Sequence, residues 1–186
     1  TPSTDCRKLS GSSVQARARQ GGEAKRLRSN TVSCFLCQLI LDALIGNPDY
    51  YTVCGSVFGC GTPLESELGA ETLTKSGDIE GAKALLKEAG YDGTPVVLMQ
   101  PTDVVTLKAQ PVVAAAALRA AGFNVDMQAM DWQTLVTRRA SQKSPAEGGW
   151  NLFFTNWIVP EIMTPLNNPM LNGRGTKGFF GWPTDA

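Results

Sequence analysis

The sequence predicts an α/β fold, in which a mostly parallel sheet is flanked by helices, and two observations carry this prediction. Helical and strand periodicities alternate from residue 78 to residue 156, in the order helix, strand, helix, strand, helix, strand. Roughly ten or more residues of helix separate successive strands, which is long enough for parallel pairing with right-handed crossovers. We therefore expect one α/β layer as the core of the 186-residue chain.

The first helix is expected to lie between Asp78, which can cap its N-terminus, and Gly90, which suits the left-handed conformation that follows many helices. Its apolar residues recur at helical spacing and are Ile79, Ala82, Leu85, Leu86 and Ala89. The short apolar run from Pro95 to Met99 then predicts a strand that is buried on both faces.

The second and third helix–strand pairs follow the same order. An Ala-rich helix is expected over residues 112–121, closed by Gly122. Residues 123–128 alternate apolar and polar side chains, as a half-buried strand does. A third helix is expected over residues 131–140, and a third strand over residues 151–155.

The regions on either side of this layer have less regular patterns. The stretch from Thr31 to Ile45 is apolar enough for a buried helix, and the sequence Gly46-Asn47-Pro48-Asp49 indicates a turn. Residues 50–63 are expected to be irregular, and residues 142–149 are expected to form a surface loop. From Ile158 onward, repeated Pro and Gly residues predict a long C-terminal coil with one short helix.

Several sequence segments, taken in order, resemble a known family. They are DIEGAKALLKEAGYDG, LRAAGFNVDMQ, MDWQTLVTRR and GGWN, with YYTVCGSVFGCGTP before them and GFFGWP after them. This set resembles the C-terminal lobe of the family 5 extracellular solute-binding proteins, which are the peptide-binding components of ABC importers. The resemblance extends from about Leu39 to Ala186 and implies a periplasmic-binding-protein-like lobe.

The resemblance also implies a function without catalysis. Family members bind peptides or similar small solutes in a cleft between two lobes, close by a hinge motion and dock on a membrane permease. We therefore expect a monomeric periplasmic binding protein that uses no cofactor. Because family members carry a second large lobe upstream, and because no signal peptide is visible here, the chain is expected to be a fragment.

Residues 1–38 are expected to be a disordered or foreign segment, and residues 39–186 are expected to form the lobe. The first 38 residues carry seven Lys and Arg residues against two acidic residues, so their net charge is +5 and the remainder sums to −5. A basic arm can bind nucleic acid. We expect no nucleic-acid partner, because this segment shows no sustained period and no aromatic residue before Phe35.

The absence of histidine excludes several kinds of site. Ser–His pairs, Cys–His pairs and His-ligated metal sites cannot form within this chain, and we predict no metal site. Two other function classes stay open. One is a carboxylate-dependent hydrolase domain that uses Glu161 with Asp126 or Asp131. The other is an isolated α/β interaction domain that uses the basic arm with Cys34 and Cys37.

Five cysteines allow one disulfide prediction. Cys54 and Cys60 are six residues apart across a Gly-rich segment, which lets their Cα atoms approach disulfide distance. In an oxidising compartment we expect a bridge between them, and two buried free thiols are the alternative. Cys34 and Cys37 have C-x-x-C spacing without the strand that precedes a redox site, and Cys6 is left over.

The candidate ligand-binding residues lie at and after the third predicted strand. They are Trp150, Phe153, Asn156, Trp157 and Glu161. Ligand clefts form beyond the carboxyl ends of strands in α/β sheets, and a Trp side chain offers a large apolar face with one N–H donor. Core packing is the alternative for the aromatic members of this set.

Glu161 is singled out by the resemblance. Family members commonly carry an acidic residue four positions before a proline, where it pairs with the α-ammonium group of the peptide, and Glu161 stands four positions before Pro165. A carboxylate that is shielded from bulk water forms a charge-assisted hydrogen bond with an ammonium group. A solvated loop glutamate is the alternative.

The third predicted helix carries further residues that a binding site could use. Asp131 and Trp132 match a family motif, and we interpret them as an N-cap and a packing residue. Arg138 and Arg139 are expected on a solvated face of the same helix. None of these four residues is therefore predicted to contact the ligand.

Overall fold

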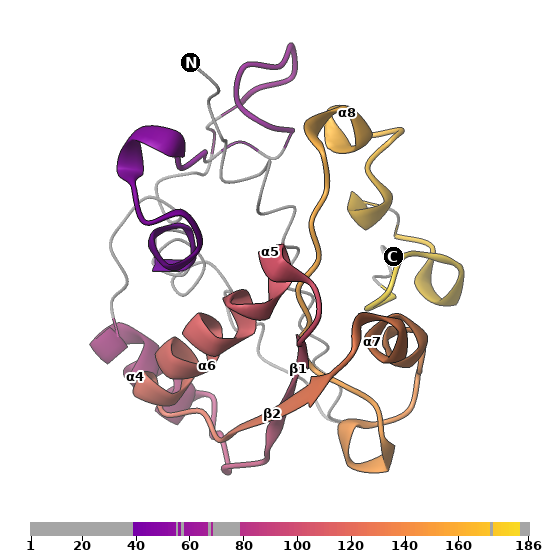
Figure 1. Ribbon diagram of the computed structural model, residues 1–186. Coiled ribbons are helices and arrows are strands. Elements are labelled where there is room, and N and C mark those ends of the chain that lie inside the picture. Colours follow the sequence, from indigo (N-terminus) through magenta and orange to yellow (C-terminus); the bar gives the residue numbers. More distant parts are fainter. Residues whose placement is uncertain are drawn as a thin grey trace.

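A pair of parallel strands lies between helices at the centre of the chain (Figure 1). The structure is a computed structural model that describes residues 39–54, 56, 58–66, 68, 79–171 and 173–182. Its main elements are α4 Ile79–Glu88, β1 Val96–Pro101, α5 Val105–Lys108, α6 Gln110–Ala120, β2 Val125–Met130, α7 Trp132–Arg139 and α8 Val159–Ile162. Short 3-10 helices are η1 Pro48–Tyr50, η2 Pro145–Glu147, η3 Pro169–Leu171 and η4 Gly175–Lys177. Residues 39–45 are also helical.

The two strands confirm the predicted parallel layer. β1 and β2 pair in parallel, with Val96 opposite Val125 and Pro101 opposite Met130. The chain between them forms α5 and α6, so the connection is helical, as a parallel pair requires. Strand β1 is buried along most of its length, in agreement with the prediction of a strand that is covered on both faces.

The predicted third strand over residues 151–155 is wrong, because this segment makes only an isolated bridge, between Leu98 and Leu152. The N–H of Leu152 donates to the Val97 carbonyl at 3.0 Å. The N–H of Val97 donates to the side-chain oxygen of Asn151 at 2.8 Å. An amide side chain therefore occupies the position that a main-chain carbonyl would take in a continuous ladder.

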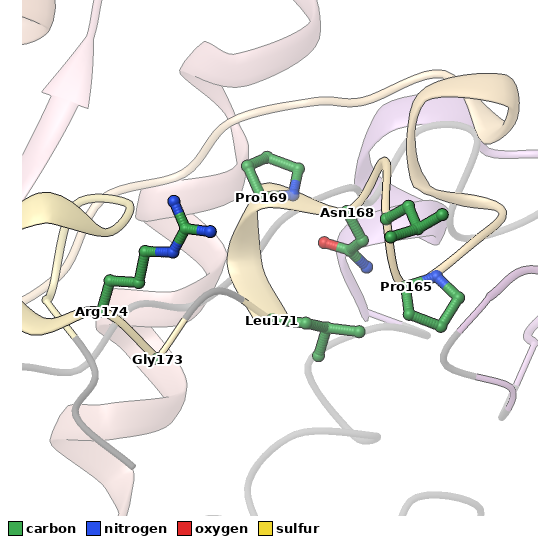
Figure 2. Close-up of a pocket in the computed structure, with 7 residues that line it drawn as sticks. Pro165, Asn168, Pro169, Leu171, Gly173 and Arg174 are labelled. Atoms are coloured by element: carbon green, nitrogen blue, oxygen red, sulfur yellow. The ribbon is translucent and has the colours of Figure 1, made fainter.

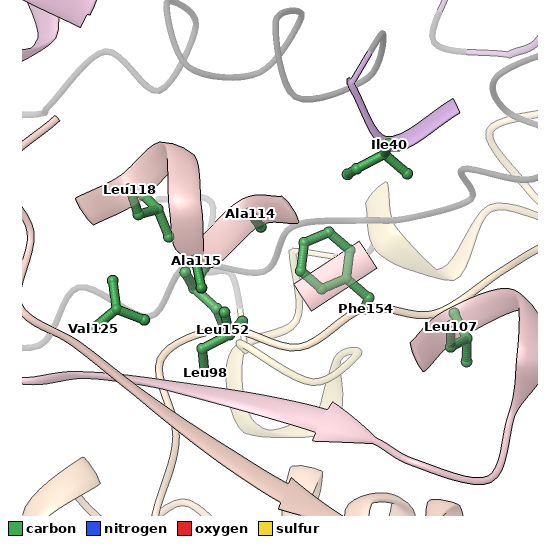
Figure 3. Packing of buried hydrophobic residues seen from close by; sticks show 9 residues of the cluster. All are labelled: Ile40, Leu98, Leu107, Ala114, Ala115, Leu118, Val125, Leu152 and Phe154. Carbon is green, nitrogen blue, oxygen red and sulfur yellow. The ribbon is translucent and has the colours of Figure 1, made fainter. Parts of the chain in front are cut away.

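The side chains of this segment still alternate between two sides of the sheet. Leu152 and Phe154 belong to a cluster with Ile40, Leu98, Leu107, Ala114, Ala115, Leu118 and Val125, beside α6 (Figure 3). Phe153 belongs to a second cluster with Trp150, Val97, Met99 and Leu135, beside α7. Burying one such side chain contributes about 1.5–3 kcal/mol, so the segment fastens both helices to the sheet.

The N-terminus of α7 confirms the predicted cap. The Asp131 carboxylate accepts from the Thr134 N–H at 2.9 Å and from the Thr134 hydroxyl at 2.6 Å. Asp103, in the loop after β1, accepts from the Trp132 N–H at 2.8 Å. Two carboxylates thus satisfy N–H groups that have no partner inside the helix, and one of them ties the start of α7 to the end of β1.

The hydrogen bonds from Thr134 lower the pKa of Asp131, and we predict a pH-dependent contribution to stability from this cap. A depressed folded-state pKa stabilises the fold above the unfolded-state pKa, which is about 3.9, and this contribution is lost as the pH falls through the folded-state pKa. Thermal unfolding of the wild type and Asp131→Asn should therefore differ near neutral pH and converge in acid. A difference in melting temperature that stays constant across this range would contradict the assignment.

Two glycines end helices as predicted. Gly90 and Gly122 follow α4 and α6 with φ angles of +69° and +99°. The apolar face predicted for α4 is confirmed only in part, because Leu86 is buried whereas Leu85 is 41% exposed. The predicted cap Asp78 lies outside the described residues. The short helix α5 was not predicted, because four residues are too few to show a period.

The region before α4 contains the predicted disulfide. Cys54 and Cys60 are bonded, with their Cα atoms 5.9 Å apart. Beside them, the Tyr51 hydroxyl donates to the Asp42 carboxylate. Residues 1–38, with the other three cysteines, lie outside the described part of the chain. Within that described part, no helix is long and apolar enough to cross a membrane.

Candidate functional site

A network of amide and hydroxyl side chains lies at the carboxyl end of β1. The side chain of Gln110, which is fully buried, donates to the Thr106 carbonyl at 2.7 Å and to the Asn156 side-chain oxygen at 3.2 Å. The Asn156 amide in turn donates to the Thr106 hydroxyl at 2.9 Å. The chain after residue 155 is thereby fixed to α5 and α6, at the end of the sheet where α/β proteins bind ligands.

Trp157 follows this network directly. Its indole ring is half-buried and lies 5.7 Å from the ring of Phe179, centroid to centroid. Its Nε1 donor is buried and has no hydrogen-bond partner among the described residues. A buried donor without a partner costs about 1–3 kcal/mol, so an acceptor that became accessible to Nε1 when the ring turned would be stabilised there.

Glu161 lies on the short helix α8 and is exposed. Its carboxylate has no side-chain hydrogen bond or ion pair with the described residues, whereas the other acidic groups considered as catalytic are engaged locally. Asp131 caps α7, and Asp126 accepts from the Gln128 side-chain amide at 2.6 Å. The lowered pKa of Asp131 is the opposite of what a general acid needs near neutral pH.

A hollow of about 470 Å³ lies in the chain that follows α8 (Figure 2). Its lining residues are Pro165, Leu166, Asn168, Pro169, Leu171, Gly173 and Arg174. Arg174 stands at one end and Pro165 at the other, with the buried amide of Asn168 between them. The hollow is open to solvent, since Leu166 in its lining is 97% exposed, and polar groups contribute much of its surface.

A comparison with protein families identifies the family of this chain. The model of the bacterial extracellular solute-binding proteins, family 5 Middle, matches residues 47–178. The chain belongs to this family. The resemblance that the sequence segments indicated is therefore confirmed.

Two further proteins resemble this family 5 chain. The probable peptide ABC transporter periplasmic-binding protein y4tO of Sinorhizobium fredii (strain NBRC 101917 / NGR234) is 34% identical over 146 residues, which are 78% of this chain and 28% of that protein. The crystal structure of the ABC transporter substrate binding protein CtaP from Listeria monocytogenes superposes with a TM-score of 0.64 at 17% identity, over 88% of this chain and 33% of that one. The second likeness confirms the predicted lobe fold, and this chain spans about a third or less of either protein.

The structure separates the five predicted ligand-contact residues of this family 5 chain into two groups. Asn156 and Trp157 are half-buried and Glu161 is exposed, so these three reach the surface. Trp150 and Phe153 have no exposed surface, and their rings pack edge to face with their centroids 4.9 Å apart. The Trp150 indole also donates to the Arg139 carbonyl at 3.0 Å, which is the hydrogen bonding expected of a core Trp.

Sequence reasoning missed residues that the site uses. Gln110 and Thr106 hold Asn156 in place, and the one available signal was an amide at the start of an otherwise Ala-rich helix.

The prediction that Arg138 and Arg139 lie on a solvated face is also wrong. Arg138 is half-buried and donates to three acceptors, at 3.1 Å to the Gly148 carbonyl, 2.8 Å to the Gly149 carbonyl and 2.5 Å to the Gln128 side chain.

Proposed function

We propose that this chain is part of the substrate-binding component of an ABC importer. In this proposal it is a monomeric periplasmic protein without catalytic activity, which binds peptides or similar small solutes in a cleft between two lobes and delivers them to the membrane permease. The observation that carries the proposal is the chain's similarity to a relative named as a probable peptide ABC transporter periplasmic-binding protein. The described lobe supplies one wall of the cleft.

The wall is formed by the chain from Asn156 to the hollow beyond α8. Asn156 is held by Gln110 and Thr106, and so presents its amide from a fixed position. Trp157 offers its partly exposed ring, and its Nε1 has no hydrogen-bond partner among the described residues. Trp150 and Phe153 support this wall from the core without touching the ligand. Such a mixture suits peptides, because an apolar surface accepts different side chains while the polar groups hold the main chain.

Glu161 is the proposed partner of the peptide α-ammonium group. An exposed carboxylate without a local partner can bind an incoming cation without first breaking a hydrogen bond. An ion pair at an exposed site contributes about 1 kcal/mol or less. Closure of a second lobe over the site would exclude water and strengthen the pair.

The test is a titration of the isotope-labelled chain with a mixed tripeptide library and with the same library acetylated at its α-amino groups. We expect the free peptides to shift the indole N–H resonance of Trp157 and to bind more tightly than the acetylated ones. Glu161→Gln should abolish this preference and weaken the free peptides by up to roughly fivefold, the equivalent of about 1 kcal/mol.

The matched control is Glu88→Gln, which neutralises an exposed glutamate at the end of α4. It should leave both affinities unchanged. If neither library shifts the Trp157 resonance up to the solubility limit of the peptides, the proposed peptide site is wrong. If both libraries bind equally well, the site stands and the role of Glu161 is wrong.

A further inference from the structure

The guanidinium group of Arg139 lies among three aromatic rings. Its guanidinium carbon lies 4.6 Å from the ring centroid of Phe180, 5.6 Å from that of Trp132 and 6.0 Å from that of Phe153. Its Nε atom is buried without a hydrogen-bond partner. Among the described residues no carboxylate forms an ion pair with it, and burial lowers the pKa of Arg139. The aromatic rings are therefore its principal partners.

These rings belong to parts of the chain that are distant in sequence. Trp132 and Arg139 lie on α7, whereas Phe180 lies in the segment Phe179–Trp182, which we call the aromatic strap. The strap runs beside α7 at the C-terminal end of the described chain (Figure 1). The position of the Phe180 ring over the guanidinium thus fixes the strap against α7.

The strap connects Arg139 to Trp157. The rings of Phe180 and Phe179 are 4.9 Å apart, and the rings of Phe179 and Trp157 are 5.7 Å apart. The indole N–H of Trp157 has no hydrogen bond among the described residues that would fix the ring. The orientation of this ring therefore depends on its packing, and Phe179 is a packing partner that leads back to Arg139.

We infer that Arg139 is a positioning residue for Trp157, acting through the aromatic strap. The cation orders Phe180, Phe180 orders Phe179, and Phe179 sets the angle at which the Trp157 indole faces the cleft. The consequence for ligand affinity rests on the proposed function, because it requires Trp157 to contact the ligand. The structural coupling between Arg139 and Trp157 does not require it.

The experiment uses the full chain labelled with 5-fluorotryptophan, whose four Trp residues give four ¹⁹F NMR signals that single Trp→Phe variants assign. Arg139→Met keeps an unbranched apolar stem and removes the charge. We expect it to shift or broaden the Trp157 signal without any ligand present. Arg139→Lys keeps the cation and should restore part of the wild-type position. A Trp157 signal that is unchanged while the Trp132 signal moves would overturn the inference.

Arg138→Met is the matched control, because it makes the same substitution one residue away and Arg138 bonds to Gly148, Gly149 and Gln128 instead. It should leave the Trp157 signal in place. Phe179→Leu removes the middle link of the strap, and in that background Arg139→Met should no longer affect Trp157. If the effect persists there, transmission through the strap is wrong. If Arg139→Met does not fold, Arg139→Lys, which should displace the Trp157 signal by a smaller amount, is compared in the same two backgrounds.

Ligand binding is measured separately with the tripeptide library. If Arg139→Met moves Trp157 and also weakens peptide binding by a few fold, both the positioning role and the proposed function are supported. If Trp157 moves but no peptide binds to any form of the chain, the proposed function is wrong and the coupling stands. If peptides bind wild type and Arg139→Met equally while Trp157 has moved, the claimed effect on affinity is overturned.

Discussion

Leu98→Ala is expected to destabilise the chain by about 2–5 kcal/mol, the range for truncating a fully buried leucine. Leu98 lies in the middle of β1 with no exposed surface, pairs with Met127 on β2 and forms the bridge to Leu152. Its side chain sits in the cluster that joins the sheet to α6 (Figure 3). A cavity at this point weakens contacts with three separate segments at once. Urea unfolding with the disulfide intact measures the loss as a lower midpoint.

The matched control is Leu166→Ala, in which the same side chain is 97% exposed. Because almost no apolar surface of Leu166 leaves water on folding, its truncation should change the free energy of unfolding by less than about 0.5 kcal/mol. A comparable loss in both variants would contradict the packing described here. In that case Leu166 would be covered in solution, for example by a second copy of the chain.

The parts of the fold that could be predicted from the sequence depend on neighbouring residues. The Asp131 cap, the glycines that end α4 and α6, and the disulfide between Cys54 and Cys60 are all determined within a few positions of the chain. The prediction of a third strand is wrong because the pairing of that segment depends on residues distant in sequence. Its outcome depends on a hydrogen bond from Val97 to a side chain 54 residues later, which no local pattern records.

The same distinction applies to the candidate site. Trp157 and Glu161 could be singled out because a strand end and a family motif point to them. The network around Gln110 could not be predicted, since it joins residues 46 positions apart. The sequence predicts a solvated face for Arg139, because charged residues at the end of a helix usually lie there. Its contact with Phe180 is established only when the C-terminal segment folds back on α7.

Gly149→Ala is expected to cost at least about 3 kcal/mol, at or beyond the upper end of what overpacking usually costs. A Cβ atom at this position would lie 2.1 Å from the Lys143 carbonyl oxygen and 2.7 Å from the Ser144 carbonyl oxygen. Both are backbone atoms, so the clash cannot be relieved by rotating a side chain. The loop from residue 143 would have to move, and the 2.8 Å hydrogen bond from the Gly149 N–H to the Ser144 carbonyl would be lost.

The neighbouring variant Gly148→Ala separates this clash from ordinary glycine effects. Gly148 has a φ angle of +89°, but there is open space where a Cβ would lie. Gly148→Ala should therefore lower the free energy of unfolding only by the cost of a left-handed backbone conformation, about 1–2 kcal/mol. Chemical denaturation compares the two variants directly, and a larger loss for Gly148→Ala would show that the loop packs differently.

Arg138 donates to the carbonyls of both glycines, so displacement of the loop by Gly149→Ala should also free the Arg138 guanidinium. Arg138→Met should then destabilise the Gly149→Ala background less than it destabilises the wild type, which a double-mutant cycle measures.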